Sequence, residues 1–217
     1  MVMEQEKQLL IKYGKKLVDE GYTVGTGGNL SRYNRDLNLM AITPTGIDFF
    51  NIQPEDIVIM KTDGTIVESS RKPSSEWMMH KLFYERRTDI NAVIHAHTIY
   101  STVLAELRWT LPASHYMIAI AGQDVRCAEY ATYGTAELAE NAFRGMKDRK
   151  AVFLANHGLL VGEATIETAY NVLEQVEYCA NIYCKAKSLG DPVILDDAEM
   201  QRMQQRFKTY GQGKSAK

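Results

Sequence analysis

NAVIHAH, residues 91–97, is the stretch that decides the fold and points to chemistry. Its apolar residues predict a buried strand, and His95 and His97 stand two positions apart within it. Side chains two apart in a strand point to the same face, so both imidazoles converge. The stretch therefore predicts a strand that presents a pair of nitrogen ligands.

A third histidine, His157, follows the apolar run AVFLAN (151–156) and precedes Gly158, where a strand can end and the chain can turn. Three neutral imidazoles leave zinc one open coordination position, as in catalytic sites, and no Cys₄ or Cys₂His₂ spacing competes for the metal. The pattern fits hydrogen-bonded histidines at the core or rim equally well, and spacing alone does not separate the two interpretations.

Glu76 opens an expected helix directly after Ser74 and Ser75, where the helix dipole favours a carboxylate. It is either an ordinary acid near the helix start, or a metal ligand or general base. His80 lies four residues further on and shares a helix face with Glu76. We interpret His80 as structural, because a helix between sheet and solvent often carries one satisfied polar residue.

Outward from this strand, helical and strand-like patterns predict a mixed α/β (α+β layered) fold. The pair 56–61 and 65–68 forms a hairpin through Thr62-Asp63-Gly64. The order lacks the regular alternation of a doubly wound fold, so we expect a central, mostly antiparallel sheet flanked by helices. The expected helices span 4–20, 75–87, 98–107, 134–146, 165–188 and 196–208, and the strands 37–43, 56–61, 65–68, 91–97, 115–120 and 151–156.

The length and composition predict a single domain that spans residues 1–217. The tail from about residue 211 is expected to be flexible, and the expected partner is a small molecule. A net charge of −2 gives no basic field for nucleic acid or an anionic membrane. The N-terminus lacks the apolar run of a secretory signal, and no run reaches transmembrane length. Three cysteines without a CxxC pair, Cys127, Cys179 and Cys184, fit a reducing cytoplasm.

Three short polar loops could bind an anion. GTGGN (25–29) frees backbone N–H groups, TPTG (43–46) adds a hydroxyl and a free turn, and PSS (73–75) places hydroxyls at a helix N-terminus. GTGGN is neither a Walker A loop nor GxGxxG, and a tight helix-to-strand turn explains it as well. Together the loops favour a small phosphorylated substrate near the metal.

Taken in order, GTGGN, ITPTGI, PSSEW, HAHT, HYMIA, CAEYATYG, NHGL and FKTYG resemble the class II aldolase/adducin family. The resemblance runs from about residue 4 to the tail. It implies the family's three-layer fold and a lyase that splits a ketose 1-phosphate, such as L-fuculose 1-phosphate, into dihydroxyacetone phosphate and L-lactaldehyde. That reaction would belong to carbohydrate metabolism, in the breakdown of fucose.

The resemblance also implies roles for individual residues. One Zn²⁺ per subunit would be held by His95, His97 and His157, with Glu76 as a fourth ligand and as the acid and base that transfers protons. The family forms a cyclic homotetramer with sites at subunit interfaces, so Tyr116 and Tyr210 would act as catalytic residues in the neighbour's site. The phosphate would meet Gly28, Asn29, Thr45, Gly46, Ser74 and Ser75.

Two departures from the family pattern concern the substrate. Gly27 stands where alanine is common, and Tyr133 stands where phenylalanine is expected, at a position that lines the aldehyde pocket. The added hydroxyl of Tyr133 could change which aldehyde is preferred. Tyr130 and Tyr133 are otherwise typical of half-buried aromatic residues.

Several alternatives share the same zinc site: a 5-deoxyribulose-1-phosphate aldolase, a pentulose-phosphate 4-epimerase and a methylthioribulose-1-phosphate dehydratase. SHYMIA (114–119) and FKTYG (207–211) favour cleavage over epimerisation. No lysine is expected in a desolvated pocket, which leaves a Schiff-base mechanism without a candidate. A non-catalytic, adducin-like assembly module need not keep metal ligands, whereas this chain has all of them.

Overall fold

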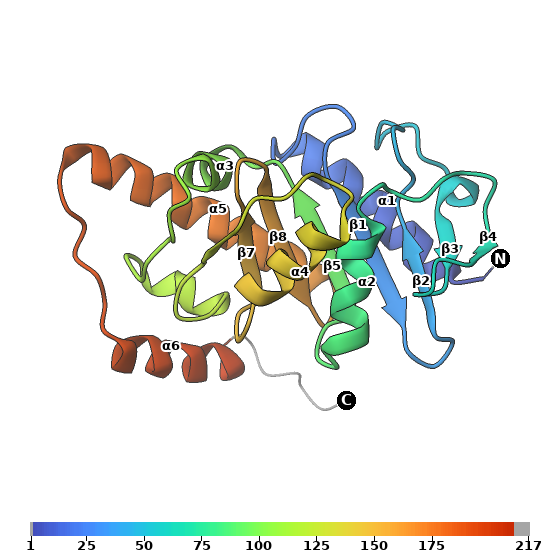
Figure 1. The fold of residues 1–217 in the computed structure, drawn as a ribbon. Helices are drawn as coiled ribbons and strands as arrows, with labels where there is room; N and C mark the ends of the chain where they lie inside the picture. Colours follow the sequence, from blue (N-terminus) through green and yellow to red (C-terminus); the bar gives the residue numbers. More distant parts are fainter. Residues whose placement is uncertain (1, 211–217) are drawn as a thin grey trace.

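An eight-stranded sheet forms the centre of the computed structural model, which describes residues 2–210 (Figure 1). The expected flexible tail from 211 lies outside these residues. Neighbouring strands pair antiparallel except β6 and β7, in the order β4-β3-β2-β1-β5-β8-β7-β6. The strands are β1 (Asn29–Asn34), β2 (Leu39–Ile42), β3 (Val58–Met60), β4 (Ile66–Glu68), β5 (Ala92–Ala96), β6 (Cys127–Ala128), β7 (Ala151–Leu154) and β8 (Gly158–Glu163).

Helices cover both faces of this sheet, which confirms the predicted layered α/β fold (Figure 1). One apolar cluster joins α1, α3 and α5 to one face, and a second joins α2 and α4 to the other. The helices are α1 (Glu4–Asp19), α2 (Trp77–Arg86), α3 (Ile99–Glu106), α4 (Ala136–Gly145), α5 (Ile166–Leu189) and α6 (Asp197–Thr209), with short 3₁₀ helices η1 (Pro54–Asp56) and η2 (Tyr116–Ile120).

Strand alternation sets the direction of His95. Ala92, Ile94 and Ala96 of β5 belong to the cluster with α5, while Val93 belongs to the cluster with α2. Because side chains alternate between the two faces, His95 lies on the α2 side with Val93. In the antiparallel pairs, Asn29 of β1 and Leu160 of β8 stand opposite His95. The sheet thus places a polar pair, Asn29 and His95, beneath the start of α2.

The strand predicted at residues 115–120 is wrong, because this segment forms η2. The His115 imidazole accepts a hydrogen bond from the Met117 backbone N–H at 3.2 Å, which starts the helical turn. Consecutive residues Ile118 and Ala119 are both buried, a pattern that strand alternation does not give. A short apolar run does not distinguish a strand from a helical turn by periodicity. Strands β1, β6 and β8 were not predicted.

No lysine was expected in a desolvated environment, but the side chain of Lys7 is fully buried. It pairs with Glu68 of β4 at 2.5 Å, and it does not line the candidate site described below. Cys179 and Cys184 pack from α5 against the core. Among residues 2–210, no helix combines the length and apolar composition needed to cross a membrane.

A buried carboxylate holds the start of α3, directly after the His95–His97 stretch. Glu177 of α5 accepts hydrogen bonds from the backbone N–H groups of Tyr100 and Ser101, at 2.7 and 2.9 Å, and from the Ser101 hydroxyl at 2.7 Å. Thr98, at the cap position, makes no side-chain cap bond. Glu177 therefore supplies the N-terminal cap of α3 from another helix.

Replacing this cap tests its contribution to stability. Glu177→Gln should lower the free energy of unfolding by about 2 kcal/mol, because it removes a charged acceptor from three buried donors. Urea denaturation measures the change. Glu174→Gln on the same helix, whose partner Lys16 lies 3.8 Å away at the surface, should change it by less than about 1 kcal/mol. Equal effects of the two substitutions would contradict the capping role.

Candidate active site

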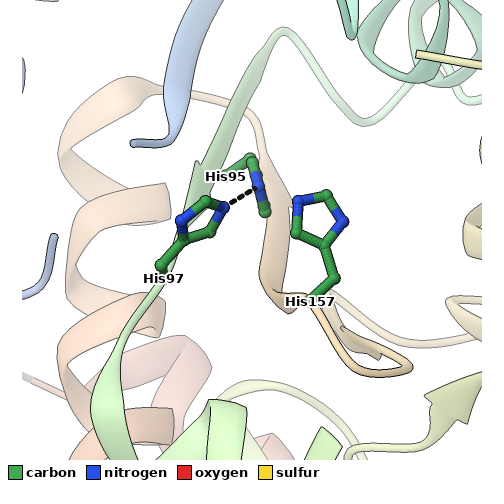
Figure 2. A group of neighbouring side chains, drawn as sticks. All are labelled: His95, His97 and His157. Atoms are coloured by element: carbon green, nitrogen blue, oxygen red, sulfur yellow. Dashed lines mark hydrogen bonds between the residues drawn. The ribbon is translucent and has the colours of Figure 1, made fainter. Parts of the chain in front are cut away.

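Three imidazoles converge where β5 ends and the β7–β8 turn begins, as Figure 2 shows. The Nε2 atoms of His95 and His97 lie 3.0 Å apart, and the nitrogen ligand atoms of all three histidines lie within 4.8 Å of one another. His95 is the last but one residue of the fully buried strand β5, His97 follows the strand, and His157 sits in the turn before β8. The structure thus brings together the three histidines that the sequence singled out.

Burial lowers the pKa of two of these imidazoles, His95 and His97. His95 is fully buried, and desolvation, followed by the neighbouring His157 and His97, holds its pKa well below the ordinary value. Desolvation and His157 likewise lower the pKa of His97. His95 Nδ1 donates to the Leu159 carbonyl oxygen at 2.9 Å, which leaves the Nε2 lone pair directed at the other two rings. Neutral, oriented imidazoles can bind a metal without first losing a proton.

Glu76 lies next to the three histidines. Its Oε2 lies 3.5 Å from His95 Nε2, and its Oε1 lies 3.7 Å from His157 Nε2. Oε1 is buried and has no hydrogen-bond partner among residues 2–210. An orphaned buried carboxylate oxygen is costly unless a further group meets it. Three imidazoles and one carboxylate suit a divalent ion such as zinc, so the residues present fit a metal.

Two glycines allow the loops to approach this cluster. Gly28 has φ +80°, and a Cβ there would lie 2.5 Å from the His95 carbonyl oxygen. A Cβ at Gly158 would lie 2.7 Å from the Ala96 oxygen and 3.1 Å from His97 Cδ2. GTGGN is therefore also a tight turn that leads into a strand, as the alternative interpretation of its sequence predicts, since β1 begins at Asn29. Its conformation and its place beside the histidines need glycine.

A cavity of about 310 Å³ opens beside the cluster. All six residues expected to meet a phosphate line it, together with Tyr133, Glu76, His97 and His157. Within the part of the chain that the structure describes, its lining contains no lysine or arginine. An anion in this cavity would therefore be held by hydroxyls, turn backbone and the N-terminus of α2. The expected phosphate residues are Gly28, Asn29, Thr45, Gly46, Ser74 and Ser75.

Other residues lining the cavity were not singled out as site residues. Thr26 belongs to the glycine-rich loop, so its proximity follows from that motif. Asn156 precedes His157 in a left-handed conformation with φ 53°, and its turn position gave the only available signal. The sequence predicts a half-buried aromatic residue at Tyr130, but its side chain is exposed and lines the cavity. Gly27, Pro44 and Ala131 complete the lining.

Tyr116 and Tyr210 do not line this cavity. Tyr116 lies in η2, stacked between His115 and Phe207 with ring centroids at 4.8 and 6.4 Å. Tyr210 follows α6, is 85% exposed, and lines a separate hollow with Phe207. Within one chain, both tyrosines are therefore surface residues of the η2–α6 region.

The fold and the histidine cluster agree with comparisons to known proteins. The family described as Class II Aldolase and Adducin N-terminal domain matches residues 8–184. The chain belongs to this class II aldolase family. Membership supports a lyase activity, and the family is typically metal dependent.

Several relatives match nearly the whole chain. A 5-deoxy-D-ribulose 1-phosphate aldolase of Bacillus thuringiensis serovar kurstaki is 48% identical over 98% of this chain and 100% of its own. The L-fuculose phosphate aldolase of Escherichia coli K12 is 41% identical over 88% of each chain. A solved L-fuculose 1-phosphate aldolase superposes with a TM-score of 0.94 and 60% identity, over 96% of this chain and 98% of that chain.

The histidine cluster predicts the metal content of the protein. The purified chain loaded with zinc should retain about one ion after dialysis, and His157→Ala should weaken zinc binding at least about 100-fold. Inductively coupled plasma analysis and competition with a chromogenic chelator measure both. His115→Ala, outside the cavity, should leave zinc binding unchanged. Full zinc retention by His157→Ala would refute the assignment.

Burial of His80 in α2 predicts a pH dependence of stability. Desolvation lowers the pKa of His80 to about 3, so folding of the chain disfavours the charged form. The resulting stability is fully present above the unfolded pKa near 6.5 and is lost as the pH falls toward the folded value. Between pH 6 and 5, metal-free wild-type protein should lose about 1.4 kcal/mol per pH unit more than His80→Gln, measured by urea denaturation. Parallel curves would contradict this.

Proposed function

We propose that this chain is a zinc-dependent aldolase that cleaves L-fuculose 1-phosphate, or a closely related ketose 1-phosphate, to dihydroxyacetone phosphate and an aldehyde. One observation carries the proposal. A single cavity joins the His97, His157 and Glu76 side chains to the hydroxyl- and glycine-rich loops. A ketose 1-phosphate, with its phosphate on C1 and vicinal oxygens on C2 and C3, would span these two parts.

The phosphate end would lie among the three polar loops. Gly28 and Gly46 have positive φ, at +80° and +68°, and Thr45, Ser74 and Ser75 add hydroxyls. The start of α2 supplies a positive dipole end at Ser75. Without lysine or arginine in the lining of the described cavity, binding would depend on many neutral donors in fixed positions.

The reacting end would lie at the histidines. Cleavage of C3–C4 leaves an electron pair on C3 and turns the C4 hydroxyl into an aldehyde, and a bound divalent ion would act as the Lewis acid for the developing charge. Glu76 would deliver the proton to C3 that completes dihydroxyacetone phosphate. Its partnerless Oε1, 3.7 Å from His157 Nε2, is the oxygen free to do so.

The C4 hydroxyl proton needs a separate acceptor. We assign this role to Tyr116 of a neighbouring subunit, whose hydroxyl would pass its own proton to solvent as it takes this one. Tyr210 would lie beside it, in a homotetramer whose sites lie at subunit interfaces. The exposure of both rings, 48% and 85%, away from the cavity of their own chain supports a role in another chain's site. We also place the enzyme in the cytoplasm, in keeping with its free cysteines Cys127, Cys179 and Cys184.

A second substrate, 5-deoxyribulose 1-phosphate, is favoured by the B. thuringiensis relative at 48% identity. It shares the phosphate end and the bond to be broken, but it would release a shorter aldehyde without a hydroxyl. Tyr133, which lines the cavity and is 67% exposed, is the residue that we expect to contact this end. Its hydroxyl, which the phenylalanine expected from the family pattern lacks, is the feature that would alter which of the two aldehydes is preferred.

A coupled assay for dihydroxyacetone phosphate tests the proposal. Zinc-loaded protein should release it from L-fuculose 1-phosphate, a chelator should abolish release, and added zinc should restore it. Release from 5-deoxyribulose 1-phosphate alone would select the second substrate. No release from either by metal-loaded protein would move the assignment to the epimerase or dehydratase, and failure to bind metal would favour an assembly module.

Glu76→Gln tests the proton transfer. It should lower kcat by about two to four orders of magnitude while zinc remains bound, because three imidazoles still hold the ion. Glu129→Gln is the matched control, since Glu129 neighbours Tyr130 in sequence and does not line the cavity. Wild-type turnover in Glu76→Gln would remove Glu76 from the mechanism.

A further inference from the structure

A chain of buried polar side chains runs behind Glu76 on the α2 side of the sheet. Ser31 Oγ lies 2.5 Å from the Tyr84 hydroxyl and 2.7 Å from His80 Nδ1. His80 Nε2 lies 2.5 Å from Asn29 Oδ1, and Asn29 Nδ2 lies 2.9 Å from Glu76 Oε2. All five side chains are buried. We call Tyr84, Ser31, His80 and Asn29 the polar chain.

The polar chain has one direction. A carboxylate only accepts hydrogen bonds, so Asn29 presents its Nδ2 to Glu76 and its Oδ1 to His80. Oδ1 accepts, so His80 carries its proton on Nε2, and its Nδ1 accepts from the Ser31 hydroxyl. Ser31 Oγ then accepts from Tyr84. Every donor therefore points toward Glu76.

His80 links the Ser31 hydroxyl to the Asn29 amide in this direction. Its full burial lowers its pKa to about 3, so the ring is neutral and has one donor and one acceptor nitrogen. With Nδ1 accepting from Ser31, Nε2 is the donor that faces Asn29. Nε2 thus donates to Asn29 Oδ1 and holds the amide with its Nδ2 directed at the carboxylate.

The two oxygens of Glu76 are consequently in different situations. Oε2 is tied to Asn29, whereas Oε1 is buried without a partner among the described residues and faces His157. Glu76 precedes α2 and makes no side-chain cap bond, so the helix itself does not orient the carboxylate. Its orientation depends on Asn29, and that of Asn29 depends on His80.

We propose that His80 is a positioning residue that orients the Glu76 carboxylate through Asn29. The inference rests on the proposed proton-transfer function of Glu76, and it extends the structural interpretation of His80 from the sequence. A satisfied core histidine would stabilise the fold alone, whereas a positioning residue also sets the rate of the step that Glu76 performs. The two roles differ in measurable ways.

The first test uses the metal-free wild-type protein and needs no activity. Nitrogen-15 NMR of the imidazole should show the neutral tautomer with the proton on Nε2 of His80. It should also show one Asn29 side-chain amide proton in a hydrogen bond that His80→Leu abolishes or shifts. A proton on Nδ1 of His80 would reverse the chain and overturn the proposal.

The second test follows the proton step itself, as deuterium exchange from D₂O into C3 of dihydroxyacetone phosphate on zinc-loaded protein. His80→Leu should slow exchange and lower kcat by about 10- to 100-fold, the range for groups that orient ligands or catalytic residues from behind. Zinc content should stay at the wild-type value, and KM should change far less than kcat. His80→Gln should recover most of the loss, because an amide can still donate to Asn29.

Met79→Leu is the matched packing control, since Met79 is 1% exposed beside His80 in α2 and lies outside the polar chain. It should leave exchange unchanged. Wild-type exchange in both His80 variants would overturn the positioning role while leaving the aldolase intact. If the wild-type protein itself shows no cleavage, the proposed function fails, and the tautomer still decides the direction of the chain.

Ser31→Ala and Tyr84→Phe, which remove single hydroxyls, should each slow exchange less than His80→Leu. They extend the test if His80→Leu does not fold.

Discussion

The site depends on the antiparallel pairing of β5 with β1 on one side and β8 on the other. This pairing puts Asn29 and Leu160 opposite His95, and the Leu159 carbonyl accepts the Nδ1 proton of His95. The backbone ladder thus fixes both the position and the orientation of the central imidazole. Gly28 and Gly158 pack so closely against the same backbone that a side chain at either position would collide with it.

Burial gives this arrangement its chemistry. Desolvation holds His95, His97 and His80 neutral, by lowering the pKa of each. A buried carboxylate that faces a cluster of imidazoles is costly inside a protein unless its charge is compensated. A divalent ion would compensate this carboxylate and meet the unpaired Glu76 oxygen. The features that make the cluster costly as a core are those that suit a metal centre.

Much of this was predictable from local sequence patterns, and the reasons are specific. The two-residue spacing of His95 and His97 marks a common strand face, and Ser74, Ser75 and Glu76 mark a helix start. The segment 115–120 was assigned to the wrong class because its short apolar run fits both a strand and a helical turn. Strands β1 and β8 carry polar or glycine residues, and their pairing with β5 is a long-range property. The Asn29–His80 hydrogen bond joins residues 51 positions apart, which no local pattern encodes.

The most direct test of the central claim is the zinc X-ray absorption spectrum of the loaded protein, with and without dihydroxyacetone phosphate. We predict three imidazole nitrogens and one oxygen at about 2.0–2.2 Å, with the oxygen shell changed by dihydroxyacetone phosphate and unchanged by inorganic phosphate. A sulfur shell, fewer than three imidazoles, or a spectrum that dihydroxyacetone phosphate leaves unaltered would contradict a metal centre that binds the substrate oxygens.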